Sequence, residues 1–296
     1  MKQLKVRTTF PFTSPTWPAG VERAALERRT GIDYDTAWAR RYPARVARAL
    51  IVDHVLRPIV RVLGAPLLHG LDRIEGLEGP AIFAANHNSH LDTPLLLTSL
   101  PDRFRHRAAV AAGADYFFPN RATGAVSALA IGAFPIERLR ISRRSTDLAT
   151  EYLDDGWSLI IFPEGGRSPD GWGQEFRSGA AFLALRTGCP VVPVHLEGTR
   201  RVLKRGAKVP TPANVHVTFG RPLRPRDGED ARAFGPRIER AVSELADERS
   251  TDWWTARKRA AGGATPALTG PDAPSWRRAW ALDEGRRRRA ERRWPR

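Results

Sequence analysis

Two histidines, two asparagines, a serine and an aspartate lie within seven residues, in the stretch NHNSHLD at 86–92. His87 and Asp92 are five positions apart, so on a continuous helix their side chains would point roughly 140° apart. They can meet only if His87 lies in a turn and Asp92 reaches back from the start of the next helix. A carboxylate on one imidazole nitrogen fixes the tautomer and leaves the other nitrogen basic. The spacing therefore predicts a general-base pair.

Two other interpretations of this stretch remain open. Asp92 or Thr93 could simply cap a helix that has Pro94 in its first turn, with His87 as a turn residue. Alternatively, His87, His90 and Asp92 could be metal ligands, although no further cluster of ligand residues recurs at suitable spacing. Ser89 is too close in sequence to be a triad nucleophile, and no G-x-S-x-G occurs. If the pair is a base, the substrate must bring the hydroxyl.

The second candidate stretch is IIFPEGGRSPDG, at 160–171. An apolar run ends there and gives way to Glu164, Gly165, Gly166, Arg167 and Ser168. Adjacent glycines allow a tight turn whose N–H groups can approach a ligand, and arginine can bind phosphate through two parallel hydrogen bonds. The Gly-Lys-Ser/Thr end of a Walker A loop is missing. As an isolated motif, the stretch is equally compatible with a surface turn.

Three more positions follow or interrupt apolar runs. Arg138 comes after the run GAFPIE, and on its own it is one of many surface arginines. Pro193 interrupts the run PVVPVHL, which indicates an edge strand or a bulge. His195, in the same run, is expected in the core or behind the site. Cys189 is the only cysteine, so the chain can form no internal disulfide and suits a reducing compartment.

Short apolar runs alternate with helical patterns between residues 81 and 220. Because these runs are continuous and not alternating, we expect strands with both faces covered. The sequence predicts an α/β fold with a mainly parallel central sheet flanked by helices. We expect strands at 81–85, 107–112, 132–137, 158–163, 190–196 and 214–220, and helices at 91–100, 120–131, 143–155, 178–187 and 230–248.

We predict three regions. Residues 1–70 form an N-terminal arm followed by amphipathic helices over 36–68, residues 71–250 form the main domain, and residues 251–296 form a partly disordered tail rich in arginine and tryptophan. The most apolar stretch, 49–68, carries Asp53, Arg57 and Arg61 on one helical stripe, so it is amphipathic and does not span a bilayer. The first twenty residues lack a continuous apolar segment, and we expect no signal peptide.

The formal net charge is +16, from 48 Lys and Arg against 32 Asp and Glu. Such an excess favours an anionic partner: nucleic acid, an acidic membrane surface or a phosphorylated substrate. Nucleic-acid binding is the less favoured class, because no helix-turn-helix or RNP-type pattern occurs and the polar clusters follow strands instead of lining a basic face.

Together, NHNSHLD, GAFPIER, FPEGGRS and VVPV resemble, in order and approximate spacing, the four conserved blocks of the glycerolipid acyltransferases. That family includes 1-acylglycerol-3-phosphate (lysophosphatidate) and glycerol-3-phosphate acyltransferases, and the resemblance covers about residues 75–220. It implies that His87 is the base and Asp92 its orienting carboxylate. Residues implied to bind substrate are Arg138, Glu164, Gly165, Gly166, Arg167 and Ser168, with Asn86, Ser89 and Pro193 in supporting roles. Gly166 replaces the threonine that the family often has.

The resemblance also implies an activity. We expect transfer of a fatty acyl group from acyl-CoA or acyl carrier protein to lysophosphatidate, giving phosphatidate, with no other cofactor and no metal. Glycerol 3-phosphate, another lysophospholipid or a glycolipid is an alternative acceptor, and a non-catalytic lipid-binding scaffold is a further alternative. Basic segments at 36–68 and 277–296 would hold the enzyme peripherally, as a monotopic protein, on the anionic cytoplasmic face of the cell membrane.

Overall fold

Seven strands form one sheet, in the order β1-β7-β6-β2-β5-β3-β4. The computed structural model describes residues 31–137, 142–204, 206–207, 209–273 and 276–278. The strands are β1 (Leu67–His69), β2 (Ile82–Ala85), β3 (Ala108–Gly113), β4 (Ala133–Ile136), β5 (Ser158–Ile161), β6 (Val191–Glu197) and β7 (His216–Phe219).

Every pair of neighbouring strands is parallel except β6 and β7. The predicted α/β class with a mainly parallel sheet is therefore confirmed. All six predicted strands are present, with ends that differ by a few residues from those expected.

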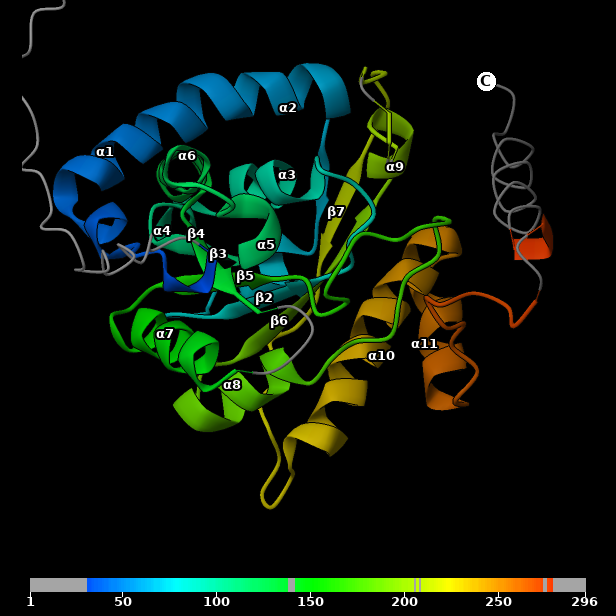
Figure 1. The fold of residues 1–296 in the computed structure, drawn as a ribbon. Coiled ribbons are helices and arrows are strands. Elements are labelled where there is room, and N and C mark those ends of the chain that lie inside the picture. The colour runs from blue at the N-terminus through cyan, green and yellow to red at the C-terminus, as the bar shows by residue number, and fades with distance from the viewer. Residues whose placement is uncertain (1–30, 138–141, 205, 208, 274–275, 279–296) are drawn as a thin grey trace, which may run out of the picture.

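Helices cover both faces of this sheet (Figure 1). Helices α1, α2, α3 and α6 lie on one side, and α7, α8 and α10 lie on the other. The α-helices are α1 (Tyr42–Ile51), α2 (Arg57–Gly64), α3 (Asp92–Ser99), α4 (Asp102–Arg105), α5 (Ala114–Phe117), α6 (Arg121–Ile131), α7 (Arg143–Asp154), α8 (Gly179–Thr187), α9 (Thr199–Val202), α10 (Ala231–Ser250) and α11 (Trp253–Ala261).

The central strands β2, β3, β5 and β6 supply side chains to two separate apolar layers. In β2, the neighbouring residues Ile82 and Phe83 point to opposite faces, as the two-residue repeat of a strand requires. Phe83 joins the layer under α2 and α3, whereas Ile82 joins the layer under α7 and α8. Both side chains are 0% exposed. This burial on both faces explains why the strand runs in the sequence are continuously apolar.

The helix predicted over 36–68 ends earlier than expected. Helix α1, a π-helical turn at Val52–Leu56 and α2 form one continuous rod that stops at Gly64. Ala65 then takes a left-handed conformation with φ 35°, and Leu67–His69 pairs with β7 as an additional edge strand. The prediction was wrong at this end because the strand's partner lies some 150 positions away in the sequence, beyond the reach of any local pattern.

Pro193 does not lie in an edge strand, because β6 is hydrogen-bonded to both β2 and β7. The alternative prediction, a bulge, agrees with the register. Val194 pairs with Phe219 and Val191 pairs with Leu223, so three steps along β6 match four steps along the partner. The partner segment therefore carries one extra residue beside the proline, which has no N–H to contribute to the ladder.

The described part of the tail includes helix α11, within the region that was predicted to be partly disordered. Helix α11 packs on α10, and Arg259 Nη1 lies 2.6 Å from Oδ1 of the buried Asp247. The predicted N-terminal arm (1–30) and the arginine-rich end of the tail (279–296) lie outside the described residues. Among the helices that are described, none has both the length and the apolar composition needed to cross a membrane.

Candidate active site

The two candidate stretches meet at one edge of the sheet. Strands β2 and β5 are parallel neighbours, with Ile82 paired to Leu159. Their carboxyl ends therefore lie side by side, so His87 follows β2 close to where Glu164 follows β5. Ligands of open α/β sheets usually bind at this edge.

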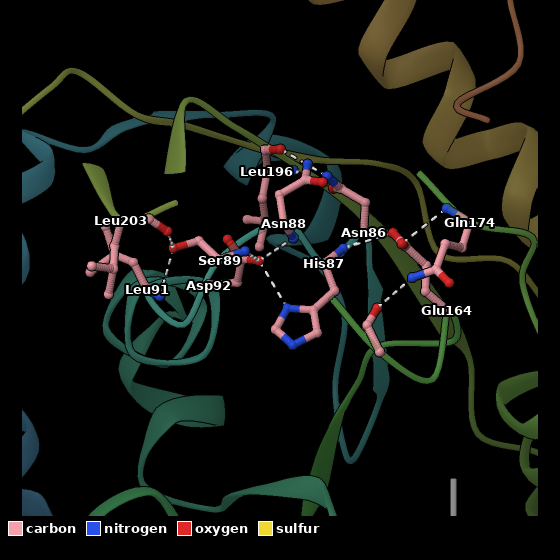
Figure 2. Close-up of polar contacts among 11 residues, drawn as sticks. Asn86, His87, Asn88, Ser89, Leu91, Asp92, Glu164, Gln174, Leu196 and Leu203 are labelled. Carbon is pink, nitrogen blue, oxygen red and sulfur yellow. Dashed lines mark hydrogen bonds and ion pairs between the residues drawn. The ribbon is translucent and has the colours of Figure 1, made fainter. Parts of the chain in front are cut away.

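His87 and Asp92 are in hydrogen-bond contact. His87 Nδ1 lies 2.9 Å from Asp92 Oδ2, and the same oxygen accepts hydrogen bonds from the backbone N–H groups of Asn88 at 2.6 Å and Ser89 at 2.7 Å (Figure 2). The Asp92 side chain is 0% exposed, whereas that of His87 is 17% exposed. The carboxylate thus accepts from Nδ1–H and leaves Nε2 as the basic nitrogen of a partly accessible imidazole.

The expectation that Asp92 or Thr93 caps the following helix is wrong. Leu91 is the N-cap of α3, and no side chain makes a capping hydrogen bond there. The Asp92 carboxylate instead reaches back to the turn before the helix, where it binds His87. This orientation separates the general-base interpretation from the one in which the aspartate is only a cap.

The backbone and ring of His87 are fixed by the segment that follows β5. Its N–H donates to Glu164 Oε1 at 2.8 Å, and its carbonyl accepts from the N–H of Ser168 at 2.8 Å. Its ring stacks on Phe162, with centroids 4.2 Å apart and planes inclined by 21°. The segment after β5 therefore holds the N–H, the carbonyl and the ring of His87.

Asn86 and Ser89 hold the turn that carries His87. The Asn86 amide accepts from Leu196 N–H at 2.7 Å and donates to Leu196 O at 2.9 Å, which continues the β2–β6 ladder by one step. Ser89 Oγ donates to Leu203 O at 2.8 Å and accepts from Leu91 N–H at 3.1 Å. Both side chains are buried, and their polar atoms form hydrogen bonds within the protein. They therefore support the turn and do not face a substrate.

The Glu164 side chain is buried and bonded to backbone groups, so it is not placed to contact a phosphate. Its side chain is 3% exposed, and its two oxygens accept from the backbone N–H groups of His87 and Gln174. Burial raises the pKa of Glu164 to about 8, although these two hydrogen bonds act to lower it. The carboxyl group therefore ties two segments together inside the protein, contrary to the expectation that it positions the acceptor phosphate.

The glycines behave as a tight turn requires, but only one needs to be glycine. Gly165 has φ +71°, and a Cβ there would lie 3.0 Å from Arg177 Nε. Gly166 faces open space, so a threonine would fit. Ser168 is 0% exposed, and its Oγ accepts from Gly171 N–H at 2.7 Å. Ser168 thus stabilises the loop by an internal hydrogen bond. We had predicted that it contacts the substrate.

Arg167 lies in the same loop, between Gly166 and Ser168. It is half-buried. Burial lowers the pKa of His90, and the positive charge of Arg167 lowers it further, so the two side chains are near enough to interact electrostatically. The His90 ring stacks on Tyr116 with centroids 5.7 Å apart. Arg138, the other predicted phosphate-binding residue, lies outside the described residues.

Three residues of this region were missed at the sequence level. Phe162 stacks on His87, Gln174 Nε2 donates to Gly166 O at 3.0 Å, and Arg177 lies against Gly165. The aromatic before the glycine motif was a usable signal for Phe162. For Gln174 and Arg177 no pattern gave a signal, because their positions depend on how an irregular loop folds back.

The single cysteine lies far from this edge. Cys189 precedes β6, which runs parallel to β2, so it lies at the opposite edge from His87. Cys189 is therefore not placed to act together with His87. Within the described ranges, no three His, Cys, Asp or Glu side chains are grouped so that they could hold a metal ion.

A sequence model of the acyltransferase family matches residues 66–197. This part of the chain is therefore similar to the acyltransferase family. The acyltransferase match includes β1 to β6 and both segments of the site described above.

Several curated acyltransferases are similar over part of their length. A chloroplastic 1-acyl-sn-glycerol-3-phosphate acyltransferase of Arabidopsis thaliana is 31% identical over 160 residues, which are 53% of this chain and 43% of the relative. A 1-acyl-sn-glycerol-3-phosphate acyltransferase of Pseudomonas aeruginosa is 36% identical over 104 residues, 34% of this chain and 39% of the relative. The chain thus spans less than half the length of these two relatives.

The fold also matches a solved structure. The 1-acyl-sn-glycerophosphate acyltransferase PlsC of Thermotoga maritima superposes with a TM-score of 0.55 at 24% identity, over 72% of this chain and 83% of that one. At this identity the likeness supports the acyltransferase fold and not a particular substrate.

Proposed function

We propose that this protein transfers a fatty acyl group from a thioester to the free hydroxyl of lysophosphatidate, giving phosphatidate. The observation that carries the proposal is the contact of 2.9 Å between His87 Nδ1 and the buried carboxylate of Asp92, at the carboxyl edge of the sheet. The choice of acceptor is supported by the names of the relatives, which are 1-acyl-sn-glycerol-3-phosphate acyltransferases.

In the proposed reaction His87 Nε2 takes the proton of the acceptor hydroxyl as its oxygen attacks the thioester carbonyl. The tetrahedral intermediate collapses, the carbon–sulfur bond breaks, and the leaving thiolate receives the proton from the imidazolium. Such a base contributes roughly 10²–10⁴-fold to the rate. Positioning of the two substrates and hydrogen bonds to the oxyanion supply the rest. The exchange of a thioester for an ester involves no redox step, so the thioester of acyl-CoA or acyl carrier protein is the only co-substrate.

Arg167 is the residue that we assign to the acceptor phosphate. Its guanidinium can bind two phosphate oxygens at once. It is half-buried, and its charge lowers the pKa of His90. Glu164 and Ser168 then act indirectly, by holding the loop against His87. Arg138 retains the role that the resemblance implies, as a second cation for the acceptor.

We further propose that the α1–α2 rod rests on the membrane. Apolar side chains of the rod face outward instead of into the core, and Tyr42 and Val62, near its two ends, are 75% and 74% exposed. The outward-facing apolar residues, called the apolar rod face below, are Tyr42, Val46, Leu50, Val55, Ile59 and Val62. Exposed arginines such as Arg41 and Arg61 flank it. An apolar face bordered by cations suits an anionic lipid surface, here the cytoplasmic face of the cell membrane.

The test is an acceptor panel with isotope-labelled acyl-CoA and mass spectrometry of the lipid products. Lysophosphatidate, glycerol 3-phosphate, lysophosphatidylcholine and a monoacylglycerol would be compared for the wild type and His87→Ala. We expect acylation of lysophosphatidate, and its loss in the variant with folding unchanged by circular dichroism. Equal turnover by His87→Ala and the wild type would contradict the role of His87 as general base. Preference for an acceptor without a terminal phosphate would contradict the proposal that lysophosphatidate is the acceptor.

A further inference from the structure

The loop between β5 and α8, residues 162–177, is called the acceptor loop here because it carries Arg167. Every residue of this loop is described, and none lies in a helix or strand. On its inner side it is fixed to His87 by the Glu164 carboxyl group and by the N–H of Ser168. The side chains of Gln174 and Ser168 bind other residues of the loop. The outer part of the loop, residues 169–173, is irregular backbone, and its shape depends on what contacts it from outside.

The end of the chain contacts the outer side of the same loop. Residues 267–273 and 276–278, called the strap, form three polar contacts with it. Gly173 N–H donates to Leu268 O at 2.8 Å, and Trp172 Nε1 donates to Arg278 O at 2.9 Å. Arg278 Nε lies 2.7 Å from Asp170 Oδ2. Two backbone carbonyls and one ion pair thus join segments that are about a hundred positions apart.

Packing reinforces these polar contacts. Gly270 has φ +72°, and a Cβ there would lie 2.3 Å from the indole ring of Trp172. The ring can therefore lie against the strap backbone only because this residue is glycine. Arg278 Nη1 also donates to Pro271 O at 2.9 Å, which closes the strap on itself.

The strap is anchored to the domain by the helix before it. Helix α11 packs on α10, and the ion pair of Arg259 with Asp247 is 2.6 Å long, with the aspartate 1% exposed. Helix α10 in turn packs on α8 and β6. The strap therefore holds the acceptor loop relative to the sheet, and it lies outside the residues that match the acyltransferase family.

We propose that the strap is a positioning element of the acceptor site. By fixing Asp170 and Trp172 it keeps the acceptor loop in the shape that presents Arg167 to the acceptor phosphate. Asp170, Trp172 and Arg278 are then positioning residues that touch no substrate. The proposal rests on the proposed function, because it takes the loop to be the binding element for the acceptor.

The test compares two neighbouring arginines in the full-length chain. Arg278→Gln breaks the ion pair with Asp170, whereas Arg277→Gln is the matched control, because Arg277 is exposed and lies over the Trp276 ring at 5.3 Å. We expect Arg278→Gln to raise the KM for lysophosphatidate about two- to five-fold, in line with a partly exposed ion pair. The KM for acyl-CoA and kcat should stay near wild type, and Arg277→Gln should change none of them.

Asp170→Asn and the double variant with Arg278→Gln complete a thermodynamic cycle. If the ion pair is the relevant contact, the double variant should be no worse than either single variant. Strictly additive increases in the acceptor KM would overturn the role of the pair. Trp172→Ala, which removes the packed ring, should raise the acceptor KM more than either single polar variant.

Hydrogen exchange measured on peptides covering 164–177 gives a readout that does not depend on activity. We expect faster exchange in Arg278→Gln than in Arg277→Gln. Equal exchange would overturn the claim that the strap holds the loop, and faster exchange with unchanged acceptor KM would overturn its role in binding while leaving the proposed function intact. If the wild type acylates no phosphorylated acceptor, the proposed function and the positioning role both fail. The hydrogen-exchange comparison then still shows whether the strap holds the acceptor loop.

Discussion

His87 lies in the turn between β2 and α3, so its orientation comes from side chains that reach it from other segments. Asp92 fixes the ring nitrogen, Phe162 fixes the ring plane, and Glu164 fixes the backbone. In the proposed reaction, a base held in this way would lose little conformational freedom when the acceptor binds. These contacts make the dyad sensitive to small changes in its neighbours as well as in itself.

Asp92→Asn tests the charge of the carboxylate that holds the imidazole. His87 Nδ1 and the N–H groups of Asn88 and Ser89 all meet the same oxygen, so an amide oxygen can replace it. The variant then lacks the negative charge that stabilises the imidazolium formed when His87 takes a proton. We expect kcat to fall by roughly 10²–10⁴-fold, with little change in the KM for lysophosphatidate. Steady-state kinetics would measure this, with the exposed Asp227→Asn as control. An unchanged kcat would rule out this role of the Asp92 carboxylate.

Glu164 predicts a pH dependence of stability. Its pKa is raised by burial from 4.5 to about 8 in the folded protein, whereas in the unfolded chain it stays near its ordinary value. Between these values the unfolded state releases the proton and the folded state retains it, so this group's contribution to stability falls as pH rises from about 4.5 to about 8.

Glu164→Gln should remove that slope. Urea denaturation of both proteins across this pH range would show the wild type losing stability relative to the variant as pH rises. A difference in unfolding free energy that does not change with pH would show that the carboxyl group is ionised in the folded state throughout.

At the scale of elements, a buried cation helps to attach the α1–α2 rod to the domain. Arg48 is 5% exposed and donates to the carbonyls of Ala39 at 2.7 Å, Ala128 at 2.9 Å and Leu129 at 3.1 Å. Burial lowers the pKa of Arg48 to about 10, which still leaves it charged at neutral pH. The last two carbonyls belong to α6. The cation therefore ties the rod to α6, with the apolar rod face outward.

Variants in that face test membrane docking. Leu50→Glu and Val62→Glu place a carboxylate where we propose lipid contact, and burial of one such apolar side chain is worth about 1.5–3 kcal/mol. We expect each to reduce sedimentation with anionic vesicles strongly while acylation of detergent-dispersed acceptor persists.

The matched control is Leu185→Glu on α8, because Leu185 is 38% exposed and lies on the opposite side of the sheet. Retained binding by the two rod variants, or equal loss in the control, would contradict docking through the rod.

At the scale of the whole molecule, the net charge of +16 would act together with the rod in the proposed membrane docking. Long-range attraction to anionic lipid is screened by salt, because the Debye length falls from about 10 Å at about 0.1 M to about 3 Å at about 1 M. The apolar contact is not screened in this way.

We therefore expect vesicle binding of the wild type to weaken as salt rises and to level off above zero. The residual binding should depend on the apolar rod face. Sedimentation with anionic and with neutral vesicles over a salt series would measure both parts. Complete loss at high salt would show that charge alone holds the protein to the vesicle.

The sequence was sufficient for features that depend on neighbouring residues. The strands and helices of the parallel sheet were predicted because their burial on both faces appears as continuous apolar runs. The contact between His87 and Asp92 was predicted because a turn followed by a helix start leaves few ways for them to meet. Gly165 was likewise placed in a tight turn by its local pattern.

Only the tertiary structure decided the features that join distant segments. Spacing does not state which way a side chain points, so Glu164 was assigned to the acceptor although its carboxylate binds two backbone N–H groups. Strand β1 finds its partner in β7, and Arg278 finds Asp170, across long stretches of chain. Such contacts form because the folded sheet brings these segments together. The local sequence around each residue does not indicate which distant segment it will contact.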